Sequence, residues 1–349
     1  MNRPILLVAA AVALAACTPD FDPASKVEKL RVLAVKAEPP EIEPAGPTAD
    51  APDRATLTSL VVRADEAADP TRKTTVLHLA CLPVPGVLDP SPCVLLAQLR
   101  DPTVFLADAA RAACAGGGGG GGQEITFAGA EVCEARVCGP VTSGGTTFPS
   151  PEVVADYDFA ALPDGAPERI IGVQAVVLAF ALDATPDELA AGAGGTCPIG
   201  DVATRLAELW ASREHVLATK RVWIRGPDAP DAPNVNPAVA GIAAGGAPLP
   251  ATVPPGTHLL APIPTPDADA LHQAYTELDA AGAPIGSKRE DWVYSWFSTV
   301  GEMDVLHTRD GETEEWSVPP EPGPTFVVTV VRDLRGGVAW TARDVTIAP

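Results

Sequence analysis

Residues 325–340 read TFVVTVVRDLRGGVAW. The run 325–332 is rich in β-branched and aromatic residues, which are typical of strands, and a second such run spans 338–347. Between them, 333–337 holds charged residues and two adjacent glycines, a composition typical of a turn. The pattern predicts a closing antiparallel hairpin and therefore a β-rich fold.

The residues before this hairpin carry further short runs of the same kind. Five more strand candidates, separated by turn residues, are 238–242, 258–262, 273–279, 291–299 and 314–318. Together with the hairpin they make about seven short strands, which is the pattern of a β-sandwich. We therefore expect one sandwich domain over residues 238–349.

The hairpin and the upstream Tyr294-Ser295-Trp296 resemble the PKD and immunoglobulin-like families. In those families a core aromatic precedes a final hairpin of the form V-x-V-x-D-x-x-G. The W-D-F-G-D-G turn of PKD domains is absent, because 296–302 read WFSTVGE. The resemblance therefore implies an immunoglobulin-like or PKD-like fold and no site.

The first part of the chain also predicts strands. Runs at 29–37, 56–63, 74–82 and 215–225 fit the two-residue period of a strand, and the first is followed by several prolines. This opening resembles immunoglobulin-like sandwich domains of bacterial surfaces. The nearly continuous apolar run 169–181 predicts a strand buried on both faces. Segments 186–191 and 201–213 are helical candidates, and we expect a second sandwich over 28–226.

A long insertion is predicted inside this first domain, at about 83–168. It contains most of the cysteines, a helical candidate at 103–113 and seven consecutive glycines at 116–122. A phosphate-binding loop needs Lys-Ser/Thr or a helix start after its glycines, whereas Gln123-Glu124-Ile125 follow here. The fold class we predict is mainly β, with two sandwich domains, the first carrying a disulfide-containing α/loop insertion.

The segment 227–237 separates the two domains and holds four prolines. We interpret it as a semi-rigid polar linker. Four of its residues carry side-chain oxygens suited to Ca²⁺, in an order similar to cadherin-type linkers, so calcium is an alternative interpretation. These calcium candidates are Asp228, Asp231, Asn234 and Asn236.

The first residues of the chain predict export. Arg3 precedes an apolar stretch too short to span a bilayer, which needs roughly 20 apolar residues. The following Leu14-Ala15-Ala16-Cys17 resembles the lipobox of bacterial lipoproteins. The resemblance implies cleavage before Cys17 and acyl chains on that residue, which hold a protein stably at a membrane. Residues 1–16 would then be a lipoprotein signal peptide, with an ordinary cleaved signal as the alternative.

A flexible tether is predicted at 17–27, because it is polar and contains two prolines. Thr18, rather than Asp, follows the anchor, which favours the outer membrane, at its periplasmic or surface face.

Six further cysteines lie between positions 81 and 197. An even number in an exported chain predicts up to three disulfides, with 15 possible connectivities. A zinc site is not supported, because no C-x2-C pair and no histidine occur in this stretch. The disulfide candidates are Cys81, Cys93, Cys114, Cys133, Cys138 and Cys197.

Charge restricts the partners. The chain has 45 acidic and 24 basic residues and a net charge of −21, which disfavours nucleic acid. Trp292, Tyr294 and Trp296 share one strand face, either as the sandwich core or as a platform that stacks on sugar rings.

No catalytic motif is present: neither G-x-S-x-G nor H-E-x-x-H occurs, and the five histidines share no metal spacing. The leading prediction is a non-catalytic binding or assembly module of the cell envelope, with no cofactor beyond its lipid. The alternatives are a glycan-binding or adhesion lipoprotein and an uncharacterised envelope enzyme.

Overall fold

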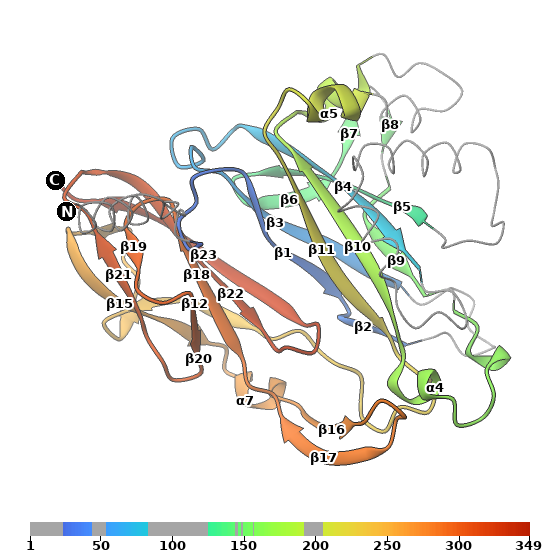
Figure 1. Ribbon diagram of the computed structural model, residues 1–349. Coiled ribbons are helices and arrows are strands. Elements are labelled where there is room, and N and C mark those ends of the chain that lie inside the picture. The colour runs from blue at the N-terminus through green and yellow to red at the C-terminus, as the bar shows by residue number, and fades with distance from the viewer. Residues whose placement is uncertain are drawn as a thin grey trace, which may run out of the picture.

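The computed structural model describes residues 24–43, 54–82, 125–143, 146–147, 149–155, 157–191 and 205–349. The predicted signal peptide, Cys17, the helical candidate 103–113 and the glycine run 116–122 lie outside these residues. The described chain is mainly β and forms two β-sandwich domains of immunoglobulin-like architecture, as predicted (Figure 1).

The first sandwich packs a three-stranded sheet on a six-stranded sheet. The smaller sheet has the order β1 (Arg31–Glu38), β3 (Arg54–Val62), β9 (Glu152–Val154). The larger has the order β2 (Glu41–Ile42), β11 (His215–Ile224), β10 (Val173–Leu182), β4 (Lys73–Cys81), β5 (Ile125–Glu134), β6 (Val137–Pro140). A short ribbon, β7 (Thr142–Ser143) with β8 (Thr146–Thr147), and the helical segments η1 (Phe159–Ala161), α4 (Pro167–Ile171) and α5 (Pro186–Ala190) complete it.

Strand β10 is buried on both faces, which confirms the interpretation of its apolar run. Its residues Ala175, Val177, Ala179 and Ala181 face the core between the two sheets. The alternate residues Val176, Leu178, Phe180 and Leu182 face a second core on the outer side, with Leu189 of α5 and Leu206 and Leu209 of the helical segment 205–210. Alternation along a strand places one apolar set on each side of the sheet.

The second sandwich packs two five-stranded sheets. One has the order β13 (Ala247–Pro248), β12 (Val239–Ala244), β15 (Gly256–Pro264), β21 (Glu314–Val318), β19 (Glu302–Met303). The other has the order β14 (Thr252–Val253), β23 (Val338–Ile347), β22 (Gly323–Arg332), β18 (Val293–Ser298), β20 (His307–Arg309). A two-stranded arm, β16 (Ala274–Leu278) with β17 (Pro284–Arg289), follows the helical turn α7 (Ala268–Leu271). The predicted closing hairpin is β22–β23, paired from 323 to 347.

A separate hydrophobic core lies between the two sandwiches, and residues of both contribute to it. Phe326, Val328 and Val330 of β22 point out of the second sandwich, whereas Val327 and Val331 point into it. The outward set packs against the outer face of β1 and β3, at Leu33, Ala34, Leu60 and Val62. Figure 1 shows β1 lying next to the β18, β22 and β23 sheet. Four sheets are therefore stacked in one body, with an apolar layer in each interval.

Two predicted boundaries in the first domain are wrong. Residues 125–134 and 152–154 are strands of the sandwich, so the insertion is narrower than 83–168. β5 was missed because its Ala128-Gly129-Ala130 centre carries no large apolar side chain, although it pairs with β4 along its length. The predicted strand 169–181 begins only at Val173, because Pro167 starts α4 and Gly172 ends it.

The predicted tether 17–27 extends too far at its C-terminal end. Ser25 and Val27 are buried, at 5% and 1% exposure. The Val27 amide donates to the Ser298 carbonyl at 2.8 Å, and the Ser298 amide donates to the Ser25 carbonyl at 3.1 Å. These bonds attach residues 25–27 to β18, so this segment is part of the second domain.

Candidate functional site

The linker between the sandwiches is bonded to both of them. The Asn234 amide donates to Glu41 Oε2 at 2.6 Å, and Asn234 Nδ2 donates to Asp333 Oδ2 at 2.9 Å. Asn236 Nδ2 donates to the Ala37 carbonyl at 2.8 Å, and Asn236 Oδ1 accepts from the Val338 amide at 2.9 Å. Each asparagine thus joins a strand of the first domain to the β22–β23 hairpin of the second.

The two aspartates of the linker have different partners. Asp228 pairs with Arg169 at 2.8 Å, next to α4. Asp231 accepts from the Thr276 amide at 2.7 Å and from its hydroxyl at 2.9 Å, on the β16–β17 arm. Burial and hydrogen bonding therefore support the polar-linker interpretation. Among the described residues, no three His, Cys, Asp or Glu side chains gather as a metal site, and calcium stays a prediction.

The β22–β23 turn is built on Asp333, which is 2% exposed. Its Oδ1 accepts from the Arg335 amide at 2.7 Å and from the Gly337 amide at 2.8 Å, as turn aspartates do. A Cβ on Gly337 would lie 2.0 Å from Asp333 Oδ2 and 2.9 Å from Pro237 Cδ, so only glycine fits. Leu334 has a φ of 64° and is 68% exposed at the tip.

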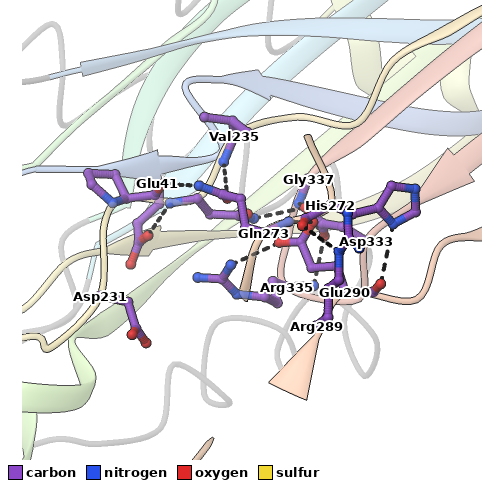
Figure 2. A network of polar contacts seen from close by, with 12 residues as sticks. Glu41, Asp231, Val235, His272, Gln273, Arg289, Glu290, Asp333, Arg335 and Gly337 are labelled. Atoms are coloured by element: carbon purple, nitrogen blue, oxygen red, sulfur yellow. Dashed lines mark hydrogen bonds and ion pairs between the residues drawn. The ribbon is translucent and has the colours of Figure 1, made fainter. Parts of the chain in front are cut away.

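Arg335 connects this turn to a buried carboxylate. Its Nη1 lies 2.8 Å from Glu290 Oε1 (Figure 2). Its guanidinium lies 4.8 Å from the centre of the Tyr275 ring. Burial raises the pKa of Glu290 above its usual range, and the charge of Asp333 raises it further, while Arg335 opposes both. The ion pair is held in place because Glu290 also accepts from Trp292 Nε1 at 3.4 Å.

Gln273 ties the linker to the same network. Its Nε2 donates to the Pro233 carbonyl and its Oε1 accepts from the Val235 amide, both at 3.0 Å (Figure 2). The neighbouring His272 ring stacks on Trp292 with centroids 3.9 Å apart. The linker is therefore fixed along its second half, and the sequence pattern that predicted it carried no signal for these partners.

A cavity of 370 Å³ lies beside this network, and both domains line it. Its walls combine aromatic and apolar groups with charges of both signs. They include Ile170, Trp223, Arg225, Asp231, Tyr275, Glu277, Leu334 and Arg335. Recesses between domains with such mixed walls are common binding sites. We take this junction as the candidate functional site.

A serine, a histidine and a glutamate meet in the first core, but they do not form a hydrolytic triad. Ser59 Oγ lies 3.3 Å, and Glu131 Oε2 lies 3.1 Å, from the same His78 Nε2. A triad needs the acid on one ring nitrogen and the nucleophile on the other. Here Nδ1 is buried and has no hydrogen-bond partner among the described residues, and Ser59 and His78 have 0% exposure. The group is structural, and its residues lie too far apart in sequence to be recognised.

A second buried charge cluster reaches across the domains. Arg136 lies in the β5–β6 turn between Cys133 and Cys138, which form a disulfide. Its guanidinium lies 3.0 Å from Glu66 and 4.6 Å from the centre of the Phe326 ring, and it pairs with Asp344. Burial raises the pKa of Glu66, and Arg136 opposes that effect. The disulfide hairpin therefore carries a contact to the second domain.

The predicted disulfides are supported where the structure describes them. Besides the Cys133–Cys138 bond, Cys81 is also disulfide-bonded. Cys93, Cys114 and Cys197 lie outside the described residues, as does the lipidation candidate Cys17.

The aromatic row of β18 belongs to the core. Trp292, Tyr294 and Trp296 are 1%, 4% and 0% exposed and pack with Trp316 inside the second sandwich. The core interpretation is confirmed, and a sugar-stacking platform on this face is wrong, because no ring face reaches solvent.

Comparisons with known proteins identify no family. No family model matches the chain, and no curated protein matches it. Among solved structures it is similar to Escherichia coli alpha-2-macroglobulin activated by porcine elastase, at 9% identity over 94% of this chain and 22% of that chain, with a TM-score of 0.23.

Two further solved structures are similar at the same low level. The native conformation of E. coli alpha-2-macroglobulin matches at 10% identity over 92% of this chain and 17% of that one, with a TM-score of 0.23. Dimeric latent PorU from Porphyromonas gingivalis matches at 10% identity over 93% and 24%, with a TM-score of 0.18. The chain spans less than a quarter of each of the three proteins. Within the described ranges, no helix is long and apolar enough to cross a membrane.

Proposed function

We propose that this protein is a lipid-anchored envelope protein that acts as a non-catalytic binding or assembly module. The anchor is Cys17, in its lipobox-like context, and the outer membrane is its proposed location. The high negative charge favours a protein partner over nucleic acid or an anionic lipid surface.

One observation carries the binding role: the two sandwiches are joined as a single body. The apolar layer between β1–β3 and β22, together with the bonds of Asn234 and Asn236, removes the freedom expected of a linker. A rigid body presents a binding surface without an ordering cost on association, which favours affinity. The recess at the junction lies where both domains contribute walls, and we propose it as the contact with a partner protein of the envelope.

Site-specific photocrosslinking in cells tests this role. A photoreactive residue replaces Leu334, which lines the junction cavity and is 68% exposed. The matched control replaces Leu259 on β15, a leucine that is 51% exposed and lines no part of that cavity. A single stoichiometric partner from position 334 and none from position 259 supports the proposal. Equal products from both positions, or none from position 334, contradict the junction as the contact.

Detergent partitioning tests the anchor separately. Wild type should enter the detergent phase, because two or more acyl chains hold a protein at a membrane. Cys17→Ser should remain in the aqueous phase. Wild type in the aqueous phase would contradict the anchor and leave the contact site untouched.

A further inference from the structure

A second cavity lies at the β22–β23 turn and shares Leu334 with the first. Its volume is 250 Å³, and both domains line it. The first domain contributes 32–35 of β1 and 218–220 of β11, and the second contributes Arg332, Leu334 and 336–338. Seven of the twelve lining residues are aliphatic, Val32, Ala218 and Val338 among them, and the others are polar, charged or glycine.

Two cations face this cavity, one from each domain. Lys220 of β11 donates to the Gly336 carbonyl. Arg332 of β22 donates from Nη1 to Ser295 Oγ at 3.0 Å and from Nη2 to the Leu33 carbonyl at 2.8 Å. Lysine has three donor hydrogens and arginine has five, so each keeps donors beyond these bonds.

Neither cation has a carboxylate partner within 4.0 Å among the described residues. The nearest acid in sequence, Asp333, directs its carboxylate into its own turn and to Asn234. Buried charges are normally paired, because removal from water is costly. Lys220 and Arg332 are both half-buried, so two partly desolvated cations with no carboxylate in reach among the described residues line the cavity of a chain with a net charge of −21.

The electrostatics of the cavity favour an anion. Burial lowers the pKa of Lys220 to about 8; Asp333 opposes this effect, and Arg332 adds to it. Burial also lowers the pKa of Arg332. A negative group between them would offset both effects, because an opposite charge nearby favours the charged form.

We propose that this cavity binds a small organic carboxylate, with its carboxylate between Lys220 and Arg332 and a short apolar body against the aliphatic wall. The volume lies just below the usual range for small-molecule sites, which begins at about 300 Å³, so the body is short. The aliphatic lining favours a carboxylate with a hydrocarbon chain over inorganic phosphate. The site does not depend on the lipid anchor, and it shares Leu334 with the junction cavity proposed above as the partner contact.

Calorimetric titration of the purified protein with a ligand series tests the assignment. Acetate, butyrate and hexanoate give the carboxylate series, butylamine is the opposite-charge control, and inorganic phosphate is the alternative anion. We expect saturable binding that strengthens from acetate to butyrate, and none for butylamine. Absence of saturable carboxylate binding overturns the proposal, and binding of phosphate alone overturns the carboxylate assignment.

Two variants locate the site. Lys220→Met and Arg332→Gln each remove one cation and should weaken butyrate binding about tenfold, the loss expected for one charge-assisted hydrogen bond. The matched control is Lys73→Met, because Lys73 is an exposed lysine of β4 outside the cavity, and its affinity should stay unchanged. Equal affinity in Lys220→Met and wild type contradicts the site.

The pH dependence gives a readout that does not require a variant to fold. Lys220 carries its charge below a pKa of about 8, so butyrate binding should weaken as pH rises through that value. The charged groups near the ligand are Lys220 on β11, Arg332 on β22 and Asp333 in the turn, and the β1 wall contributes none. In protein with ¹³C-methylated lysines, butyrate should raise the pKa of the methyl signal that titrates near pH 8. An unchanged titration at saturating butyrate would overturn the proposal.

Discussion

The two sandwiches share an architecture and differ in what fills them. The second has an aromatic core of Trp292, Trp296 and Trp316, and each indole N–H has a partner, such as Thr308 Oγ1 at 2.8 Å from Trp296. The first has a core of alanine, valine and leucine and also buries polar and charged groups such as His78, Glu131 and Glu66. The first domain therefore depends more on polar contacts and cross-links, and the second depends more on packing.

Removal of the central indole of the second domain should have the largest effect. Trp296→Ala deletes a side chain with 0% exposure and leaves a cavity, so the free energy of unfolding should fall by about 4 kcal/mol. Urea denaturation followed by circular dichroism measures the loss. The control Trp340→Ala removes a half-buried indole and should cost less. Equal losses in both variants would contradict the aromatic core as the main source of stability.

The buried polar group of the first domain should give the next largest effect. Glu131→Ala leaves the Ser59 amide and the His78 ring without their acceptor in a buried site, and it should cost about 3 kcal/mol. The same denaturation experiment applies. The exposed Glu134 on the same strand is the matched control, and Glu134→Ala should be nearly neutral. A neutral Glu131→Ala would show that solvent satisfies these groups.

Loss of the disulfide in the β5–β6 hairpin should lower the free energy of unfolding by a smaller amount. The double variant Cys133→Ser, Cys138→Ser opens a short loop and should cost about 2 kcal/mol in the chain-entropy account. It should also loosen the Arg136 contact with the second domain, and hydrogen exchange at β5 and β6 measures that. Faster exchange limited to the β16–β17 arm would argue against the hairpin as an interdomain contact.

The best-predicted strands are those whose own residues form a nearly continuous apolar run. β10 and β22 are nearly continuous apolar runs, and each packs apolar side chains on both faces. β5 was not predicted, because small residues lie where it crosses β4 at His78 and Gly129. A local sequence pattern therefore predicts a strand only where the strand's own side chains are large and apolar enough to require burial.

The junction could not be predicted, because its contacts are distant in sequence. Asn236 and the Ala37 carbonyl are 199 residues apart, so the linker pattern suggested a spacer and gave no sign of the bonds that fix it. One sequence feature did point to this region. Lys220 shares a strand face with Val216, Ala218 and Val222, and a lysine on an otherwise apolar face indicates that a polar or charged group lies against that face. What lies opposite that face depends on the other domain.

Weakening of the linker should separate the behaviour of the two domains. Asn236→Ala removes bonds to Ala37 and Val338 and should cost about 1.5 kcal/mol. Differential scanning calorimetry should show a lower and broader transition, because the domains become less coupled. Val235 is exposed and contributes only its backbone amide to a hydrogen bond, so Val235→Ala is the matched control. An unchanged transition in Asn236→Ala would contradict the role of the linker.

The smallest effect concerns a carboxyl group in the second domain. Burial raises the pKa of Glu314, which has 0% exposure, above its usual 4.5. The neutral Glu314 carboxyl therefore makes its full contribution to the free energy of unfolding below pH 4.5. That contribution is lost as pH rises through the folded-state pKa. Glu314→Gln should be more stable than wild type at neutral pH, and the difference should vanish below pH 4.5. A constant difference at all pH values would contradict this account.

The central claim is that the two sandwiches form one rigid body, and residual dipolar couplings test it most directly. Amide couplings are measured in weakly aligned protein and fitted to the structure for each domain separately. A rigid junction predicts that a single alignment tensor fits both sets, with the same magnitude and orientation. Two tensors of different magnitude would show independent motion of the domains and would contradict the claim.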